Sequence, residues 1–238
     1  MRNYARLPVK NAYNVRELGG YPCADGSATE YHRFLRADDL SQLDAADIYL
    51  LLKYGLSAVV DLRSASELAQ NPDPFSKIAE VNYINIPLMA DDVADVTRVM
   101  VQRPSTYLRE AYIEMLIGST GAVKRIFDFI AEQSGCVLFH CAAGKDRTGV
   151  LAMLLLGLSE VGKGDIIANY EVTGTYISEN PAMKQAGQQY PSELMESRRE
   201  YIEPAIDYIV SAYGSVENYL SNAGVSAGTL EKVKSKLL

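Results

Sequence analysis

The sequence predicts an α/β fold, with a central, mostly parallel sheet flanked by helices and a helical C-terminal part. Residues 56–63 form a strongly apolar run, which is typical of a strand buried on both faces of a parallel sheet. Residues 136–140 form a second apolar run, and a helical pattern follows each of the two. The length of 238 residues suits a single domain, with residues 1–10 as a loose arm and residues 164–238 as the helical portion.

Strand and helix signals alternate in the first half of the chain. Ser41 and Asp44 form a cap pattern at the start of one helix, and Ser64 and Glu67 form a capping box at the start of the next. The expected elements are a strand at 31–36, a helix at 41–54 that stops at Gly55, the strand at 56–63, a helix from Ser64 onward and a strand at 81–88.

The second half of the chain is mostly helical. Residues 150–158 are apolar almost all round, so we expect this helix to be buried. Residues 182–193 contain Gln, Gly and Pro and are either a mobile lid over the site or a plain connector. The expected elements are helices at 105–117, 121–133, 148–161, 165–176, 193–212 (kinked or interrupted at Pro204), 215–222 and 226–237, and the strand at 136–140.

The formal net charge is −7, which argues against binding to nucleic acid or to a membrane surface, since both favour a basic protein surface. No apolar run is long enough to span a bilayer, and residues 1–6 show no signal peptide. We therefore expect a cytoplasmic protein, or a secreted one without a visible signal peptide. The metal-ligand residues, which include only two histidines, do not cluster at suitable spacing, so we expect no metal and no other cofactor.

The three cysteines, Cys23, Cys136 and Cys141, do not form the paired framework of a disulfide-rich protein. A reducing compartment fits this number best. Cys23 or Cys136 either forms a disulfide with an oxidised Cys141 or is packed in the core, and the sequence leaves both options open.

The loop after residues 136–140 has the composition of an anion-binding site. A loop between a strand and a helix N-terminus directs successive backbone N–H groups inward, and this concavity binds anions. The fork of Arg147 matches two phosphate oxygens. The N–H groups, the helix dipole and Arg147 all favour the thiolate of Cys141 at the bottom of this cradle. The residues between Cys141 and Arg147 are Ala142, Ala143, Gly144, Lys145 and Asp146.

The residues that flank the loop have expected supporting roles. The hydroxyl of Thr148 can donate to the sulfur of Cys141, and the ring of His140 can bond to loop carbonyls. A buried apolar role is the commonest fate of a cysteine, but the strand, the arginine, the threonine and the following helix together favour a nucleophile. A nucleotide-binding P-loop is excluded, because Asp146 stands where that motif needs Ser or Thr.

Residues 140–149, His-Cys-Ala-Ala-Gly-Lys-Asp-Arg-Thr-Gly, resemble the signature of the atypical bacterial tyrosine and phosphoinositide phosphatases. The Lys-Asp pair inside the loop separates this family from ordinary protein tyrosine phosphatases. The resemblance extends from about residue 11 to the end, with further blocks at 14–21, 36–40, 61–64 and 213–217. It implies a cysteine-phosphatase-like fold and a phosphatase of dual or triple specificity.

The resemblance implies that Asp146 is the general acid. Asp91 and Asp92 are the alternative acids, because ordinary tyrosine phosphatases keep their acid on a loop before the catalytic cysteine. The other interpretation of Asp91 and Asp92 is that they cap a helix over 93–101. Lys145 either captures a second phosphate, as on a phosphoinositide, or forms a salt bridge to a carboxylate such as Asp61.

Three further residues are candidates for the support of the loop. Asp61 and Arg63 end a strand at the edge where open α/β sheets bind ligands, so we expect them to support the loop or touch substrate; the alternative is a surface salt bridge. Arg36 either points toward the phosphate site or is an ordinary strand-end arginine.

Together these features predict a phosphomonoester hydrolase that acts on phosphotyrosine proteins through a phospho-cysteine intermediate, with phosphoinositides as a further candidate substrate. The competing class is a non-catalytic phosphate-binding module. An arsenate reductase or sulfurtransferase with a similar loop is a further alternative, but Arg147 and Thr148 favour a phosphatase over it. This sequence also has no well-placed resolving cysteine, which a reductase would need. The sequence does not indicate the oligomeric state.

Overall fold

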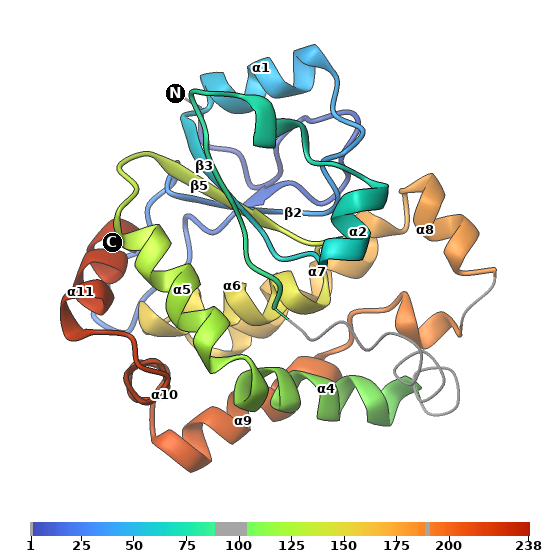
Figure 1. Cartoon of the computed structure of the whole chain (residues 1–238). Coiled ribbons are helices and arrows are strands. Elements are labelled where there is room, and N and C mark those ends of the chain that lie inside the picture. The colour runs from blue at the N-terminus through green and yellow to red at the C-terminus, as the bar shows by residue number, and fades with distance from the viewer. Residues whose placement is uncertain (1, 89–103, 189–190) are drawn as a thin grey trace.

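The computed structural model describes residues 2–88, 104–188 and 191–238. Within these residues, a five-stranded sheet in the order β1-β2-β5-β3-β4 forms the centre of the molecule (Figure 1). β1 pairs with β2 in antiparallel orientation, and the other neighbours are parallel, which confirms the expected sheet. The strands are β1 (Arg16–Glu17), β2 (Phe34–Ala37), β3 (Leu56–Asp61), β4 (Asn82–Asn85) and β5 (Cys136–His140).

Helices connect and cover these strands. The helices of the first half are α1 (Ala45–Lys53) and α2 (Ala65–Gln70), followed by the 3-10 turn η1 (Pro74–Lys77). The later part contains α4 (Pro104–Gly118), α5 (Thr120–Ala131), α6 (Asp146–Leu158), α7 (Lys163–Ile177), α8 (Pro181–Ala186), the 3-10 turn η2 (Ser192–Leu194), α9 (Arg199–Tyr213), α10 (Val216–Asn222) and α11 (Ala227–Leu237).

The strand that precedes Cys141 lies in the middle of the sheet. β5 pairs with β2 on one side and with β3 on the other, so that His140 lies beside Ala37 and Asp61. Because these strands are parallel, their carboxyl ends meet at one edge of the sheet. The loop that starts at Cys141 therefore leaves the sheet where the ends of β2 and β3 are close by.

Both faces of β5 are buried, as expected for a central parallel strand. Since side chains alternate between the faces of a strand, Val137 and Phe139 join one hydrophobic core and Leu138 joins a second one, which includes Leu51 of α1. Figure 1 shows α1 on one side of the sheet and α5 and α6 on the other. The sheet is thus covered on both faces.

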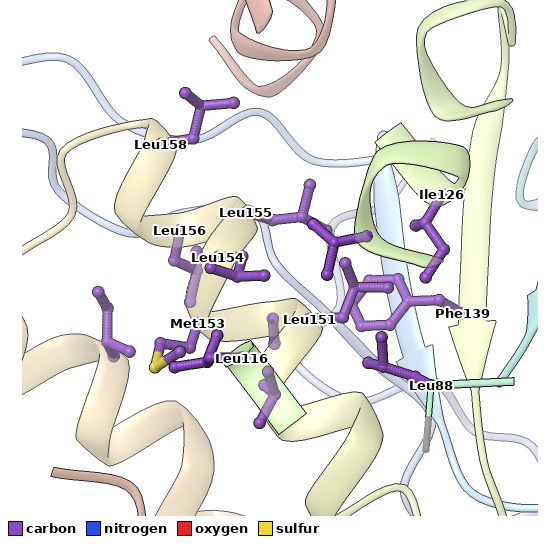
Figure 2. Close-up of a cluster of buried hydrophobic side chains, with 14 of the residues drawn as sticks. Leu88, Leu116, Ile126, Phe139, Leu151, Met153, Leu154, Leu155, Leu156 and Leu158 are labelled. Carbon is purple, nitrogen blue, oxygen red and sulfur yellow. The ribbon is translucent and has the colours of Figure 1, made fainter. Parts of the chain in front are cut away.

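Helix α6 lies at the centre of the larger core and is buried almost all round, as its sequence predicts. Figure 2 shows the leucines of α6, among them Leu151 and Leu155, near Phe139 of β5 and Ile126 of α5. This packing holds the first turn of α6 rigidly against the end of β5. The loop between them is therefore supported at both of its ends.

Several element boundaries differ from those expected. α1 begins at Ala45 rather than Ser41, because the carboxylate of Asp44 caps the helix by accepting from two backbone N–H groups. β2 begins only at Phe34, because His32 has a backbone φ of 65°, which is incompatible with an extended strand. α9 begins at Arg199 rather than at residue 193, and Pro204 lies inside it without ending it.

Other local expectations are confirmed. Ser64 and Glu67 form the capping box of α2, with both of its hydrogen bonds present. Ser215 and Ser226 cap the closing helices α10 and α11. Asp91, Asp92 and the helix considered over 93–101 lie outside the described residues.

Candidate active site

Two side chains from distant parts of the chain hold the middle of the loop between β5 and α6. Arg36, at the end of β2, donates from Nη2 to the carbonyl oxygen of Gly144 at 2.7 Å. The amide of Asn14 donates to the same oxygen at 3.1 Å and lies 3.3 Å from the carbonyl oxygen of Ala143. Both side chains are buried, and burial lowers the pKa of Arg36 to about 10. Arg36 thus contacts the loop itself and is not an ordinary strand-end arginine.

The other carbonyl oxygens of the loop also have partners. Nδ1 of His140 lies 3.3 Å from the carbonyl oxygen of Cys141. The Asp39 N–H donates to the carbonyl oxygen of Ala142 at 2.9 Å, and the Gly149 N–H donates to the carbonyl oxygen of Lys145 at 2.8 Å. Within the described part of the chain, no protein group accepts from the backbone N–H groups of residues 142–145. A loop with bonded carbonyls and free N–H groups has the polarity of an anion cradle.

The cradle depends on glycine at position 144. Gly144 has a backbone φ of +64°, which side chains with a Cβ rarely adopt. A Cβ at this position would also lie 2.4 Å from the carbonyl oxygen of Ala37 and 2.8 Å from the Asn14 amide nitrogen. The conformation of the loop and its close approach to β2 therefore both require glycine.

Cys141 lies at the base of the loop and is 2% exposed. Thr148, in the first turn of α6, is fully buried, and its hydroxyl has no hydrogen-bond partner among the described residues. Because buried hydroxyl groups normally have a partner, the Thr148 hydroxyl is free to donate, and its expected bond to the sulfur of Cys141 stays a prediction.

Arg147 is held by a carboxylate of α2. Its Nη1 and Nη2 donate to the two oxygens of Glu67 at 2.6 and 2.7 Å. Burial opposes the charge of Arg147, but the hydrogen bond to Glu67 and the charge of Cys141 outweigh it, so the pKa of Arg147 is raised. A guanidinium has five N–H donors, so the Nε side of Arg147 can bind two phosphate oxygens while Glu67 holds its terminal side.

Asp146 occupies the first position of α6, and its side chain is 35% exposed. Its Oδ1 accepts a hydrogen bond from the Tyr112 hydroxyl at 2.5 Å. The amine of Lys145 lies 3.4 Å from the same oxygen. Asp146 is thus a partly exposed carboxylate beside Arg147, whereas the alternative acids, Asp91 and Asp92, lie outside the described residues.

Lys145 is directed into the protein. The residue is 1% exposed, and its amine donates to the carbonyl oxygen of Leu194 in η2 at 2.6 Å. Among the described residues, the carboxylate within its reach is Asp146, so the expected salt bridge is present but its partner is Asp146 and not Asp61. Lys145 therefore ties the loop to the segment that follows α8.

A buried group of charged residues lies below the loop. Asp61 and Arg63 form a fully buried ion pair at 2.7 Å, so the alternative of a surface salt bridge is wrong. Burial opposes the charge of Asp61, but Arg63 outweighs it, and the pKa of Asp61 is lowered. Nε2 of His140 lies 3.0 Å from Asp73 and 3.7 Å from Asp61. Because His140 also contacts the carbonyl of Cys141, this group supports the loop from inside the protein.

Burial alone would lower the pKa of His140, but the adjacent carboxylate of Asp73 and the charge of Asp61 outweigh this effect and raise the pKa. Asp61, Asp73 and His140 are also the kinds of residue that ligate metals, and their donor atoms lie within 4.8 Å of one another. The cation next to Asp61 is Arg63, so we assign this group a structural role.

Comparison with known proteins decides the family. Residues 7–238 match the family described as "Tyrosine phosphatase family". The chain belongs to the tyrosine phosphatase family. It is 35% identical to a tyrosine-protein phosphatase of Nostoc commune, over 91% of this chain and 78% of the relative. It is also 26% identical to the triple specificity protein phosphatase PtpB of Mycobacterium tuberculosis, over 97% of this chain and 98% of that protein.

Among solved structures, P. aeruginosa TpbA in complex with pTyr is similar to this tyrosine phosphatase with a TM-score of 0.43 and 15% sequence identity, over 95% of this chain and 100% of that chain. Membership of the family favours a phosphatase over the arsenate reductase or sulfurtransferase considered above. Across the residues that the structure describes, no helix combines the length and the apolar character that crossing a membrane requires.

Cys136 is not a resolving cysteine for Cys141. The two residues lie at opposite ends of β5, and at about 3.3 Å per residue their Cα atoms are too far apart for a disulfide. Cys136 is free and buried in the second core, which raises its pKa above the ordinary range. Cys23 is also free and belongs to the larger core.

Sequence reasoning missed the contacts that Asn14, Glu67 and Tyr112 make with the site. Asn14 belongs to a block that resembles the family, which was the one available signal for it. Glu67 was predicted only as a helix cap, and its bond to Arg147 crosses 80 residues of sequence. Tyr112 had no signal beyond its place in an amphipathic helix, because its contact with Asp146 depends on how α4 packs beside α6.

Proposed function

We propose that this tyrosine phosphatase hydrolyses phosphomonoesters through Cys141, and that phosphotyrosine in proteins is its substrate. The observation that carries the proposal is the loop of residues 141–145, whose carbonyl oxygens all have partners while the N–H groups of residues 142–145 remain available. The named activities of the relatives from Nostoc commune and Mycobacterium tuberculosis support the substrate class.

In the first step the Cys141 thiolate attacks phosphorus in line with the leaving oxygen. The S–P bond forms and the P–O bond to the leaving group breaks. The N–H groups of Ala142, Ala143, Gly144 and Lys145 and the Nε side of Arg147 hold the equatorial oxygens and stabilise their charge. Asp146 gives its proton to the leaving oxygen, and the product of this step is a phospho-cysteine and a free phenol.

In the second step the Asp146 carboxylate takes a proton from water, and the resulting hydroxide attacks phosphorus. The S–P bond breaks and inorganic phosphate leaves. The hydroxyl of Thr148 donates a hydrogen bond to the sulfur, which makes the thiolate of Cys141 a better leaving group.

Phosphoinositides are a second candidate substrate, supported by the resemblance of the Lys145-Asp146 pair to the family signature. A second phosphate at the mouth of the cradle would need the amine of Lys145. In the structure this amine donates to the carbonyl oxygen of Leu194. Turnover of phosphoinositides therefore requires Lys145 to leave that partner, which makes phosphotyrosine the favoured substrate.

The first experiment is turnover of p-nitrophenyl phosphate in reducing buffer by the wild type and by Cys141→Ser. We expect activity in the wild type and its complete loss in the variant. A wild type that binds vanadate without turnover would instead be a phosphate-binding module. Parallel assays on a phosphotyrosine peptide, a phosphoserine peptide and phosphoinositide micelles then rank the substrates; phosphoinositide turnover above that of the phosphotyrosine peptide would overturn the preference stated here.

A further inference from the structure

The two oxygens of the Asp146 carboxylate have different surroundings. Oδ1 accepts from the Tyr112 hydroxyl at 2.5 Å and lies 3.4 Å from the amine of Lys145. Among the described residues, no protein donor bonds to Oδ2. The proton that an acid must carry therefore belongs on Oδ2, because a proton on Oδ1 would displace the donor that is already there.

The donor to Oδ1 is itself held in place. Tyr112, on α4, is 1% exposed, and its oxygen lies 2.6 Å from the hydroxyl oxygen of Tyr170 on α7. The two rings meet edge to face at 6.0 Å. The single proton of the Tyr112 hydroxyl is donated to Asp146, so the Tyr170 hydroxyl must donate to Tyr112. The result is a directed chain of hydrogen bonds that ends at Asp146, and such chains strengthen each of their members.

Both tyrosines remain donors at neutral pH. Burial is the main cause that raises the pKa of Tyr112 and of Tyr170 well above the ordinary value, and the charge of Asp146 adds to it. Neither hydroxyl therefore competes with Asp146 for the role of acid. In the described part of the chain, the other charged or titratable groups near Asp146 are Lys145, Arg147 and Tyr107.

The packing around these tyrosines leaves them little freedom. Leu108, Tyr112, Met115 and Leu116 form the buried stripe of α4 at helical spacing. Tyr170 lies against Gly149 in α6, where a Cβ would approach its ring to 3.0 Å. Gly149 thus makes room for Tyr170 beside the first turn of α6, and this explains the last glycine of the loop signature.

We propose that Tyr112, backed by Tyr170, is the positioning residue of the general acid, which holds Oδ1 of Asp146 so that Oδ2 carries the proton toward the leaving oxygen. This inference rests on the proposed role of Asp146. The alternative is that the hydroxyl groups of the two tyrosines only form a hydrogen bond with each other inside the core, with no effect on the acid.

The test compares Tyr112→Phe, Asp146→Asn and the double variant on a series of aryl phosphates with leaving groups from p-nitrophenol to phenol. General acids contribute roughly 100-fold or more, so Asp146→Asn should lose at least this much on phenyl phosphate and far less on p-nitrophenyl phosphate. Tyr112→Phe should lose about tenfold on phenyl phosphate and under about threefold on p-nitrophenyl phosphate. The double variant should match Asp146→Asn within about twofold.

Removal of the Tyr112 hydroxyl also removes a donor that stabilises the Asp146 carboxylate. The alkaline limb of the kcat profile, along which the acid loses its proton, should therefore move to higher pH in Tyr112→Phe. Tyr170→Phe, which leaves the direct donor in place, should shift the limb and the leaving-group dependence in the same direction by a smaller amount. It also serves as the second variant if Tyr112→Phe does not fold.

Tyr219→Phe is the matched control. The Tyr219 hydroxyl is buried and donates to the carbonyl oxygen of Leu116 on the same helix, α4, at 2.8 Å. Its loss should leave the leaving-group dependence unchanged. Equal losses on both substrates in Tyr112→Phe, or a further loss when Tyr112→Phe is added to Asp146→Asn, would overturn the positioning role. If Asp146→Asn shows no leaving-group dependence while Cys141→Ser is inactive, the acid is another residue and the phosphatase assignment still stands.

Discussion

Glu67 and Arg147 form a bidentate ion pair. The two terminal nitrogens of the guanidinium donate to the two carboxylate oxygens at 2.6 and 2.7 Å. The same Glu67 oxygen that accepts from Arg147 Nη1 also accepts from the Ser64 N–H at 2.8 Å. One carboxylate thus caps α2 and orients the arginine of the loop. The helix that follows β3 and the cradle that follows β5 are coupled through this side chain.

Replacing Glu67 with Gln should weaken the hold on Arg147, since one oxygen and the negative charge are lost. We expect vanadate affinity and kcat/KM on a phosphotyrosine peptide to fall by about tenfold each, because small displacements of a binding group are costly. Ser64→Ala is the control: it removes the other bond of the capping box, should cost about 1 kcal/mol of stability and should leave vanadate affinity unchanged. Equal vanadate affinities of all three proteins would exclude the orienting role.

Gly144→Ala should abolish most of the activity, with a loss in kcat/KM of roughly 100-fold or more, because the new Cβ would collide with Ala37 and force the loop to move. The matched control is Gly228→Ala in α11, where a Cβ meets nothing within 4 Å. This control should keep full activity and gain about 0.5–1 kcal/mol of stability. Retention of activity by Gly144→Ala would show that the cradle does not need its present conformation.

Stability should depend on pH through His140, whose pKa is raised in the folded state by Asp73 and Asp61. A group with a raised folded pKa stabilises the protein below its unfolded value, about 6.5 for His. This contribution is lost as the pH rises through the folded value. Urea unfolding between pH 6 and pH 9 should therefore show a free energy of unfolding that falls with pH in this range.

Asp73→Asn should flatten this dependence. The asparagine retains an oxygen that can cap η1 at the Phe75 N–H, but it lacks the charge that favours protonated His140. A curve for Asp73→Asn that is parallel to the wild type would show that the pH dependence has another origin.

Lys145→Met should loosen the contact between the loop and η2, because the carbonyl oxygen of Leu194 loses its buried donor. We expect faster hydrogen exchange at residues 192–195 and a higher KM for the phosphotyrosine peptide. Lys184→Met, at an exposed position of α8, is the control and should change neither. A selective loss of phosphoinositide turnover in Lys145→Met, with normal exchange, would instead favour the capture of a second phosphate by this lysine.

Short-range patterns were predicted well. The strand at residues 136–140 and the buried apolar helix after the loop are local features, and each is present in the structure. The capping box of Ser64 and Glu67 is local as well and is confirmed. Such signals are reliable because side-chain periodicity and end caps act within about one turn of chain.

Long-range contacts were predicted poorly. The inward course of Lys145 toward Leu194 spans 49 residues of sequence, and the bond between Tyr112 and Asp146 spans 34. In the sequence, Lys145 looks like any surface lysine and Tyr112 looks like any core tyrosine. Their partners are set by the packing of α4 and η2 around the start of α6, which no local pattern reports.

The residues of the loop alone predict its chemistry: a thiol, a run of small residues and an arginine stand between an apolar strand and a buried helix, and this arrangement is typical of an anion cradle. The way in which the cradle is held became visible in the folded molecule. Asn14 and Arg36 bind its carbonyls, Glu67 binds its arginine and Tyr112 binds its carboxylate. The reason is physical. Hydrophobic periodicity and helix capping are encoded by neighbouring residues, whereas the meeting of distant polar groups depends on sheet register and on helix packing, which form only when the whole chain folds.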